Sequence, residues 1–180
     1  MGLQKPDDLI IKTERLTLRP RVKADADVLH ASFSDPELMK YWSRPPTTSL
    51  EETRTYVTNN LERNVDLCCL WSIDYEGSLA GTVDLFGWHD DMMELGYLVA
   101  KQHQGKGLSY EAAKAVVDFG FGKLDLHRIE AQLHPDNAAS SGLLEKLGFQ
   151  REGHLRLNYC IEGTYSDTLI YGLLASDPRP

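Results

Sequence analysis

The sequence has no apolar run long enough to cross a membrane. Every apolar stretch falls short of the roughly 18 uninterrupted residues that a transmembrane helix needs. The opening residues MGLQKPDD carry no apolar core of the signal-peptide type, and Pro6 stands where an N-myristoylation signal requires Ser or Thr. We therefore expect neither a membrane partner nor a lipid anchor.

Cysteines and closely spaced histidines are also scarce. Of the three cysteines, Cys68 and Cys69 are adjacent, and neighbours on a strand point to opposite faces, so the sequence offers no disulfide framework. A reducing, cytoplasmic setting is therefore expected. None of the six histidines forms a close pair at metal-ligand spacing, and no His–Cys arrangement accompanies Cys160. We expect neither a metal site nor an acyl-cysteine.

Positive charge is in deficit, because 19 Lys and Arg residues face 27 Asp and Glu residues and give a net charge of −8. Binding of nucleic acid relies on clustered basic side chains, so nucleic acid is not an expected partner. A cationic substrate suits the acidic chain better, although an acidic surface also simply keeps a protein in solution.

The chain is long and apolar enough for one core. Its 180 residues, 42% of them hydrophobic, predict a single domain. Alternation from Ile11 to Leu18 predicts a strand, and short helices are expected within 23–34 and 35–42. A longer helix follows, opened by Ser49 and Glu52 in the spacing of a capping box.

The middle of the chain changes to a period of two from Leu67 onward. Three strands are predicted there: LCCLWSIDY, SLAGTVDLFGW and MMELGYLVA. A turn at Glu76-Gly77 and a polar turn at 89–91 make them an antiparallel meander. A glycine loop, a helix from about Leu108 to Phe121 and the strand HRIEAQLH then form a βαβ unit. Its two strands should run parallel, with a ligand crevice at their carboxyl ends.

The C-terminal part predicts a short helix followed by two strands. In AASSGLLEKLGF, Gly148 stands where a left-handed residue ends a helix, and Phe149 can pack back on the last turn. The fold class is therefore α/β, with a mixed sheet and helices on both of its faces.

Two glycines, Gly105 and Gly107, separate the predicted strand from the predicted helix. Bare backbone and helix-end amides at such a place can cradle a phosphate. A dinucleotide fingerprint would need a glycine in place of Tyr110 and an acidic residue near His127, and Walker spacing is absent as well. A tight turn without a ligand is the remaining alternative, and it explains one glycine better than two.

With Gln102 included, QHQGKG matches the Q/R-x-x-G-x-G/A signature of the GNAT acyl-CoA N-acetyltransferases, and the chain resembles that superfamily. ERLTLRP, ELGYLVAKQHQGKG, HPDNAASSGLLEKLGF and REG look like its RimJ/RimL branch, which acetylates ribosomal-protein N-termini. The resemblance covers about 9–174 of the single domain at 1–180. It implies a GNAT-type fold with one mixed, mostly antiparallel sheet of about seven strands. Gln104 departs from the branch, which often has an aromatic residue there, and this affects loop packing.

The resemblance implies acetyl-CoA as the cosubstrate. Its pyrophosphate would rest on main-chain amides of the loop, and its pantetheine arm would pair with the end of the preceding strand. The implied loop residues are Gln104, Gly105, Lys106, Gly107, Leu108 and Ser109, and the implied strand residues are Leu98, Val99 and Ala100. In the family pattern N-x-x-S, Asn137 binds the pantetheine arm and the hydroxyl of Ser140 reaches the thiol.

Two side chains are predicted to carry the chemistry. Ser140 is the candidate general acid for the leaving thiolate, with Ser141 as the alternative in register, and helix capping is the competing role for Asn137 and Ser140. The attacking amine must lose a proton, and Glu94 is the candidate base, because partial burial would raise its pKa. An ordinary rim carboxylate is the competing role. Asp84, His89 and Asp91 are further candidates for the base.

The acceptor site is the least determined part. Tyr159, Tyr165 and Asp167 lie in strands that wall this site in relatives, although core packing is the first expectation for the tyrosines. The sequence predicts an N-acetyltransferase in which an amine attacks the thioester directly. The acceptor is a protein N-terminus, such as that of a ribosomal protein, or a small amine. A non-catalytic acyl-CoA binding or sensing module is the alternative function, and a homodimer is the default assembly.

Overall fold

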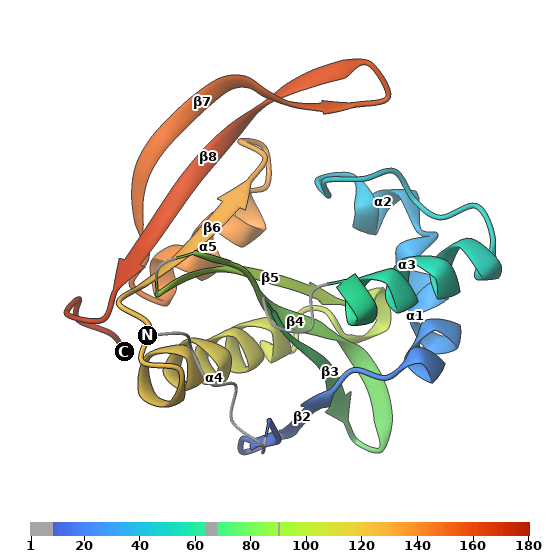
Figure 1. The fold of residues 1–180 in the computed structure, drawn as a ribbon, viewed down its shortest axis with the longest axis horizontal. Coiled ribbons are helices and arrows are strands. Elements are labelled where there is room, and N and C mark those ends of the chain that lie inside the picture. Colours follow the sequence, from blue (N-terminus) through green and yellow to red (C-terminus); the bar gives the residue numbers. More distant parts are fainter. Residues whose placement is uncertain (1–8, 64–67, 90) are drawn as a thin grey trace.

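The structure is a computed structural model that describes residues 9–63, 68–89 and 91–180. Its strands form one sheet with the order β1-β2-β3-β4-β5-β6-β8-β7 (Figure 1). The strands are β1 (Ile11–Lys12), β2 (Leu16–Pro20), β3 (Cys69–Tyr75), β4 (Ser78–His89), β5 (Met92–Val99), β6 (Arg128–Leu133), β7 (Gln150–Ile161) and β8 (Thr164–Leu174). The helices are η1 (Lys23–Asp25), α1 (Ala26–Phe33), α2 (Pro36–Met39), α3 (Leu50–Arg63), η2 (Lys101–His103), α4 (Leu108–Lys123) and α5 (Ala138–Lys146).

The first predicted strand is divided into β1 and β2, which is why the sheet has eight strands and not about seven. A tight turn, in which the amide of Thr13 donates to the carbonyl of Leu16 (3.0 Å), folds β2 back so that Ile11 pairs with Leu18. Polar residues fill this turn, and the single strand predicted from Ile11 to Leu18 ran across them. The predicted meander is confirmed as β3, β4 and β5, although residue 90 of its second turn lies outside the described residues.

The sheet is mixed, as predicted. β5 and β6 pair in parallel, whereas the other neighbouring strands pair antiparallel. The parallel ladder covers only the start of the two strands and ends where Glu94 pairs with Glu130. Beyond this point β5 continues to Val99 and β6 to Leu133, and Figure 1 shows the two strands separating. The predicted crevice beside the carboxyl ends of these strands is therefore built into the backbone.

Helices cover both faces of the sheet, as predicted. α4 packs against the inner strands and buries Ala112 and Val116 completely. On the opposite face, α1 and α3 form a second apolar cluster around Phe33. Adjacent residues of β5 serve the two faces, because Leu98 packs with the α1–α3 cluster and Val99 with the α4 cluster. Within the described ranges, no helix has the length and apolarity needed to span a membrane.

The predicted helix ends are confirmed at two places. At the start of α3, the hydroxyl of Ser49 accepts the amide of Glu52 (3.2 Å). At the end of α5, Gly148 adopts φ 94°, its amide donates to Glu145, and the amide of Phe149 donates to Leu144, both at 3.0 Å. This pair of main-chain hydrogen bonds is a Schellman motif, in which a left-handed glycine ends the helix.

Replacing Gly148 with Ala should lower the free energy of unfolding by about 1–3 kcal/mol, the usual cost of a non-glycine residue in the left-handed region. A Cβ there would also lie 2.9 Å from the carbonyl oxygen of Pro178. Gly142→Ala, inside the same helix, is the matched control, because its Cβ meets nothing within 4 Å. It should raise stability by about 0.5–1 kcal/mol. Urea denaturation measures both, and changes of the same sign would contradict this account.

Candidate active site

The glycine loop has the backbone that its sequence predicts. Gly105 and Gly107 adopt φ 76° and 77°, which side-chain-bearing residues rarely adopt. Gly107 is the N-cap of α4 and provides no side-chain cap, so the first-turn amides of this helix face outward with the positive end of the helix dipole. Such a loop can bind an anionic group. Both positions favour glycine because both have a positive φ.

The loop is also held from both sides. The side-chain amide of Gln104 donates to the carbonyl of Val99 (3.2 Å), which ties the loop to the end of β5 and is the packing role expected of this residue. The guanidinium of Arg15 donates to the carbonyl of Lys106 (2.9 Å). The ammonium of Lys106 lies 5.2 Å from the ring centre of Tyr75, a cation–π contact that leaves a positive charge beside the loop.

The end of β5 presents main-chain groups to the gap left by β6. The amide of Ala100 donates to the carbonyl of Ala80 (2.8 Å), and bonded and non-bonded pairs alternate along an antiparallel ladder. Leu98, opposite Thr82, therefore directs its main-chain groups to β4. Tyr97 and Val99 direct theirs to the open side. Of the three strand residues implied by the resemblance, Val99 is the one whose amide and carbonyl both face the gap, and its carbonyl also accepts the Gln104 side chain there.

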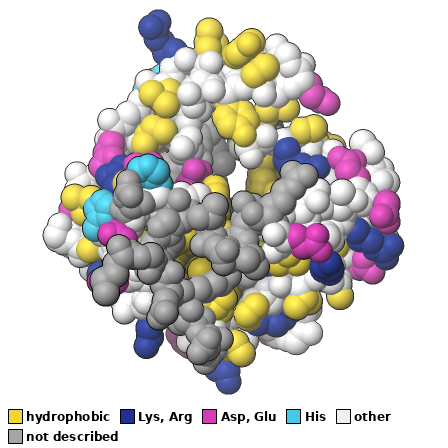
Figure 2. All heavy atoms as spheres, in the orientation of Figure 1, with side chains coloured by type: hydrophobic (Ala, Val, Ile, Leu, Met, Phe, Trp, Pro, Cys, Tyr) yellow, Lys and Arg dark blue, Asp and Glu magenta, His cyan; other side chains and the backbone are white. Residues whose placement is uncertain are grey.

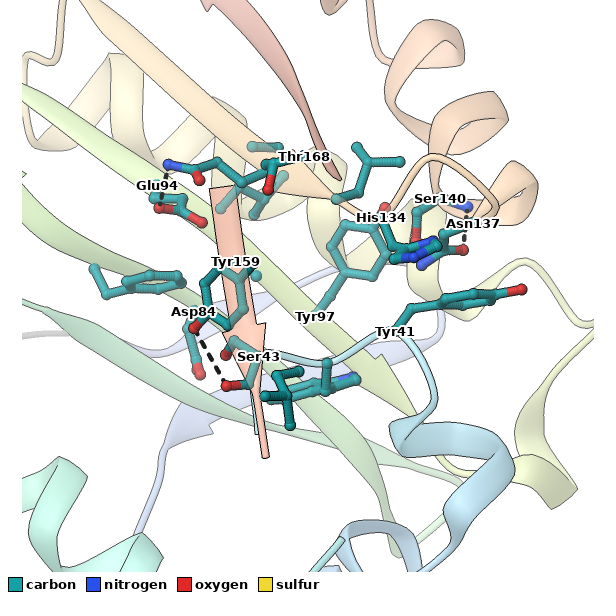
Figure 3. Close-up of a pocket in the computed structure, with 18 of the residues that line it drawn as sticks. Tyr41, Ser43, Asp84, Glu94, Tyr97, His134, Asn137, Ser140, Tyr159 and Thr168 are labelled. Carbon is teal, nitrogen blue, oxygen red and sulfur yellow. Dashed lines mark hydrogen bonds between the residues drawn. The ribbon is translucent and has the colours of Figure 1, made fainter. Parts of the chain in front are cut away.

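A cavity of about 960 Å³ lies beside this edge, between the segment that joins α2 to α3, the central strands and the β7–β8 hairpin. Figure 2 shows it as a hollow in this face of the molecule, with hydrophobic side chains visible inside. Glu94, Tyr97, Asn137 and Ser140 all line it, and Figure 3 shows their side chains around the same space. Residues that are far apart in the sequence thus meet at one site.

Glu94 lies where the parallel ladder ends. It faces Glu130 across the ladder, and the side-chain amide of Gln132 lies 3.4 Å from its carboxylate. Burial, reinforced by the negative charge of Glu130, raises the pKa of Glu94 to about 7. The expected upward shift is confirmed. A carboxyl group with this pKa can accept a proton near neutral pH and is well matched to an amine as its proton donor.

Ser140 reaches the cavity from the first turn of α5. Its amide donates to the side-chain oxygen of Asn137 (3.2 Å), so Asn137 does cap this helix. Burial raises the pKa of Tyr97, and the neighbouring Ser140 side chain partly opposes the increase. Of the two serines that the sequence left open, Ser140 lines the cavity. Capping by Asn137 and a cavity role for Ser140 therefore coexist.

The other candidates for the base are placed less favourably. Asp84 lines the cavity, but its carboxylate is paired with the buried guanidinium of Arg21 and accepts the amide of Trp71 (3.3 Å). His89 and Asp91 are exposed at the far end of the β4–β5 hairpin. Among the described residues, no group of three or more His, Cys, Asp or Glu side chains is arranged to hold a metal ion.

The expectation that the two C-terminal tyrosines pack in the core is wrong. Tyr159 is 37% exposed and Tyr165 is 62% exposed, because the ends of β7 and β8 extend past β6 and have no layer to pack on (Figure 1). Tyr159 and Asp167 line the cavity instead. Cys160, beside Tyr159, is a free and exposed thiol.

Sequence reasoning missed several residues of the cavity. The hydroxyl of Tyr159 donates to the carbonyl of Ser43 (3.2 Å), and the ring of Tyr41 stacks on His134 with centroids 5.2 Å apart. The contacts join the α2–α3 segment to β7 and to the residue after β6, so only a tertiary structure reveals them. Tyr97 was missed because strand alternation assigns it to the face opposite Glu94. It reaches the cavity because β6 has moved away.

Known proteins share this sequence pattern. A family model described as an acetyltransferase (GNAT) domain matches residues 15–150. An uncharacterized N-acetyltransferase of Bacillus licheniformis is 35% identical over 168 residues, which cover 90% of this chain and 94% of the relative. The resemblance to GNAT acetyltransferases noted in the sequence is therefore confirmed.

Solved structures share the fold. Spermidine N-acetyltransferase from Vibrio cholerae, in complex with CoA and spermine, superposes with a TM-score of 0.80 at 27% identity, over 91% of this chain and 98% of that chain. A Salmonella typhimurium enzyme that modifies the N-terminal serine of a 50S ribosomal subunit protein has the same fold, with a TM-score of 0.82 at 23% identity over 92% and 98%. The chain therefore belongs to the GNAT family and is an N-acetyltransferase that uses acetyl-CoA.

Proposed function

We propose that acetyl-CoA lies along the open edge of β5, from the glycine loop to the cavity, and that Glu94 and Ser140 handle the two protons of the transfer. In this arrangement the amides between Gly105 and Ser109 receive the pyrophosphate. The left-handed glycines and the uncapped start of α4 support this role. The overall acidity of the chain is no obstacle, because the positive helix end and Lys106 act locally.

The pantetheine arm completes the β5 edge where β6 has left it. The main-chain groups of Tyr97 and Val99 are free of β4 by ladder alternation, so an extended arm can pair with them as an additional strand would. Asn137 uses its side-chain oxygen to cap α5, which leaves its NH₂ group as a donor to the arm. The amides of the same edge are positioned to donate to the thioester oxygen.

Proton transfer is divided between two side chains on opposite sides of the reacting bond. Glu94, as a carboxylate, accepts a proton from the ammonium group of the acceptor and so frees the lone pair that attacks the carbonyl carbon. As the carbon–sulfur bond breaks, Ser140 donates its hydroxyl proton to the sulfur. The nitrogen loses its second proton to solvent in the same step, and solvent re-protonates Ser140 past the neighbouring Tyr97 side chain, so that the proton on Glu94 is the one released overall.

The acceptor is proposed to be a primary amine that enters as a cation. Carboxyl groups of Glu94, Glu162 and Asp167 line the cavity together with the ammonium group of Lys40, so its charge is negative on balance. Two acceptor classes fit: a polyamine, as bound by the Vibrio cholerae relative, and a peptide N-terminus, as modified by the Salmonella typhimurium enzyme. Spermidine and a short peptide with an N-terminal serine therefore both serve as acceptors in the assays below.

One observation carries this proposal: a carboxyl group with a pKa of about 7 lies in a cavity at the start of the strand that leads to the glycine loop. A non-catalytic module that only binds acyl-CoA would need the loop, but it would gain nothing from a half-buried carboxyl group with a raised pKa. The observation therefore favours catalysis over the binding-only alternative.

Glu94→Gln should reduce kcat/KM by about 100-fold or more at pH 7, because the amide cannot accept a proton. In the unmodified enzyme, kcat/KM should rise as the pH increases through about 7, since Glu94 loses its proton there. Glu94→Gln should lack this rise. Its deficit should shrink above roughly pH 9, where the solution itself supplies neutral amine. The measurement is a pH profile with either acceptor.

Glu162→Gln provides the control for the Glu94 profile, because Glu162 lines the same cavity from the β7–β8 turn. This variant should keep the rise near pH 7. A Glu94→Gln enzyme that showed the same rise would remove Glu94 from the role of base.

Gly107→Val should weaken CoA binding by at least about tenfold, because valine disfavours the left-handed conformation that aims the loop amides. Gly163→Val is the control. Gly163 has a similar φ of 82° in the β7–β8 turn and open space around its Cβ, so the substitution imposes comparable strain far from the loop. Isothermal calorimetry with CoA should detect the loss of affinity only in Gly107→Val. Equal affinity in the two variants would refute the proposal that the loop binds the pyrophosphate.

Ser140→Ala should lower kcat while changing the KM for acetyl-CoA by less than about threefold, because the hydroxyl acts when the thiolate leaves. Ser141→Ala is the neighbouring control, and it should leave kcat within about twofold of the unmodified enzyme. The assay follows release of free CoA at saturating acceptor. A larger effect on kcat from Ser141→Ala than from Ser140→Ala would reverse the assignment.

A further inference from the structure

The sequence motif ERLTLRP reaches the site described so far only through the bond from Arg15 to the glycine loop. In ERLTLRP, Leu16 and Leu18 are buried in the core. Arg19 pairs with Asp25 and Asp74, both at 2.8 Å, which ties β2 to the surrounding elements. Arg15, at the turn between β1 and β2, is neither buried in the core nor bound to the elements around β2. Its partners lie nearly a hundred positions away, on the glycine loop and on α4.

The first partner of Arg15 is Glu111, in the first turn of α4. The Glu111 carboxylate accepts the Arg15 side chain through Nε (2.7 Å) and Nη2 (2.6 Å), and it also accepts the Arg15 amide (2.9 Å). A fourth bond comes from the hydroxyl of Thr13 (2.6 Å). Burial alone would raise the pKa of Glu111, but the hydrogen bonds from Thr13 and Arg15 hold it below its ordinary value. One carboxylate thus fastens the β1–β2 turn to the start of α4.

The second partner of Arg15 is the glycine loop itself. Nη1 donates to the carbonyl of Lys106 (2.9 Å), the residue between the two left-handed glycines. Nη2 also lies only 3.7 Å from the position that a Cβ on Gly107 would take, so the guanidinium rests against the loop. The planar fork of Arg15 therefore spans from the helix to the loop that precedes it.

We propose that Arg15, fixed by Glu111, is a positioning residue that holds the glycine loop in its CoA-receiving conformation before CoA arrives. The inference rests on the proposed role of the loop. Glycines have the widest conformational freedom of any residue, so an untethered loop would have to be ordered by the ligand at the expense of affinity. The bond to Lys106 restrains the peptide plane between the two glycines.

The geometry favours positioning over direct contact with phosphate. Nε and Nη2 are directed at Glu111 and Nη1 at the Lys106 carbonyl, so each guanidinium nitrogen already has a protein acceptor. The charge of Arg15 is also compensated by Glu111 at 2.6 Å. What Arg15 provides is the shape of its fork, which a lysine cannot reproduce because its ammonium is a single point charge.

The test compares Arg15→Gln, Arg15→Lys and Arg19→Gln in the full-length protein. Calorimetry measures the Kd for CoA, and steady-state kinetics measure kcat at saturating acetyl-CoA. Arg15→Gln and Arg15→Lys should each raise the Kd by about tenfold and leave kcat within about twofold, because only ordering of the loop is lost. Arg19→Gln removes ion pairs on the same strand but away from the loop. It should lower the melting temperature without changing the Kd.

Three results would overturn the inference: an unchanged Kd in Arg15→Gln, a normal Kd in Arg15→Lys, or an equal rise in Arg19→Gln. The second would mean that charge and not shape matters, and the third would mean that general destabilisation is the cause. The proposed role of the loop is tested separately by Gly107→Val. If Gly107→Val loses CoA affinity and Arg15→Gln does not, CoA binding by the loop is supported and the positioning role of Arg15 is refuted.

Discussion

The separation of β5 from β6 after Glu94 and Glu130 is the constraint on which the site depends. A sheet that ended its parallel ladder so early without a purpose would leave main-chain donors and acceptors of β5 unpaired next to the core, which is costly. Here those groups face the gap, and an extended ligand can satisfy them. The same separation lets Tyr97 turn toward Ser140 and opens the cavity in which Glu94 lies.

Electrostatics at the end of the ladder follow from the same geometry. Like charges directly opposite each other on neighbouring strands are unfavourable, and Glu94 and Glu130 are such a pair. The structure resolves the conflict unequally. Glu130 is bound by Arg128 (2.8 Å), whereas Glu94 is half-buried in the cavity wall and has its pKa raised to about 7. Among the described residues, sheet topology thus raises the pKa of Glu94 without an oppositely charged partner for its carboxylate.

The sequence predicted the features that follow from local rules. Gly105 and Gly107 predicted a loop of unhindered backbone, Ser49 and Gly148 marked helix ends, and alternation located β3, β4 and β5. The pKa shift of Glu94 was also foreseen in direction, because burial of a strand residue can be argued from its face. The family resemblance supplied acetyl-CoA, which no residue pattern alone would have named.

The remaining features depend on which distant segments meet. The β1–β2 turn consists of polar residues between two apolar stretches, and the sequence prediction joined the two stretches into one strand. The choice of Ser140 over Ser141 depends on how α5 is rotated toward β5, and the exposure of Tyr159 depends on how far the hairpin extends past β6. Arg15 looked like an ordinary strand residue, because Glu111 and Lys106 are brought to it only by the fold.

Residue-resolved amide hydrogen exchange, measured by NMR with and without CoA, tests the central claim most directly. If the ligand pairs with the open edge of β5, the amides of Tyr97 and Val99 should become strongly protected on binding, together with those between Gly105 and Ser109. The Leu98 amide, already directed at β4, should change little. Binding of CoA with no added protection at Tyr97 and Val99 would contradict the account.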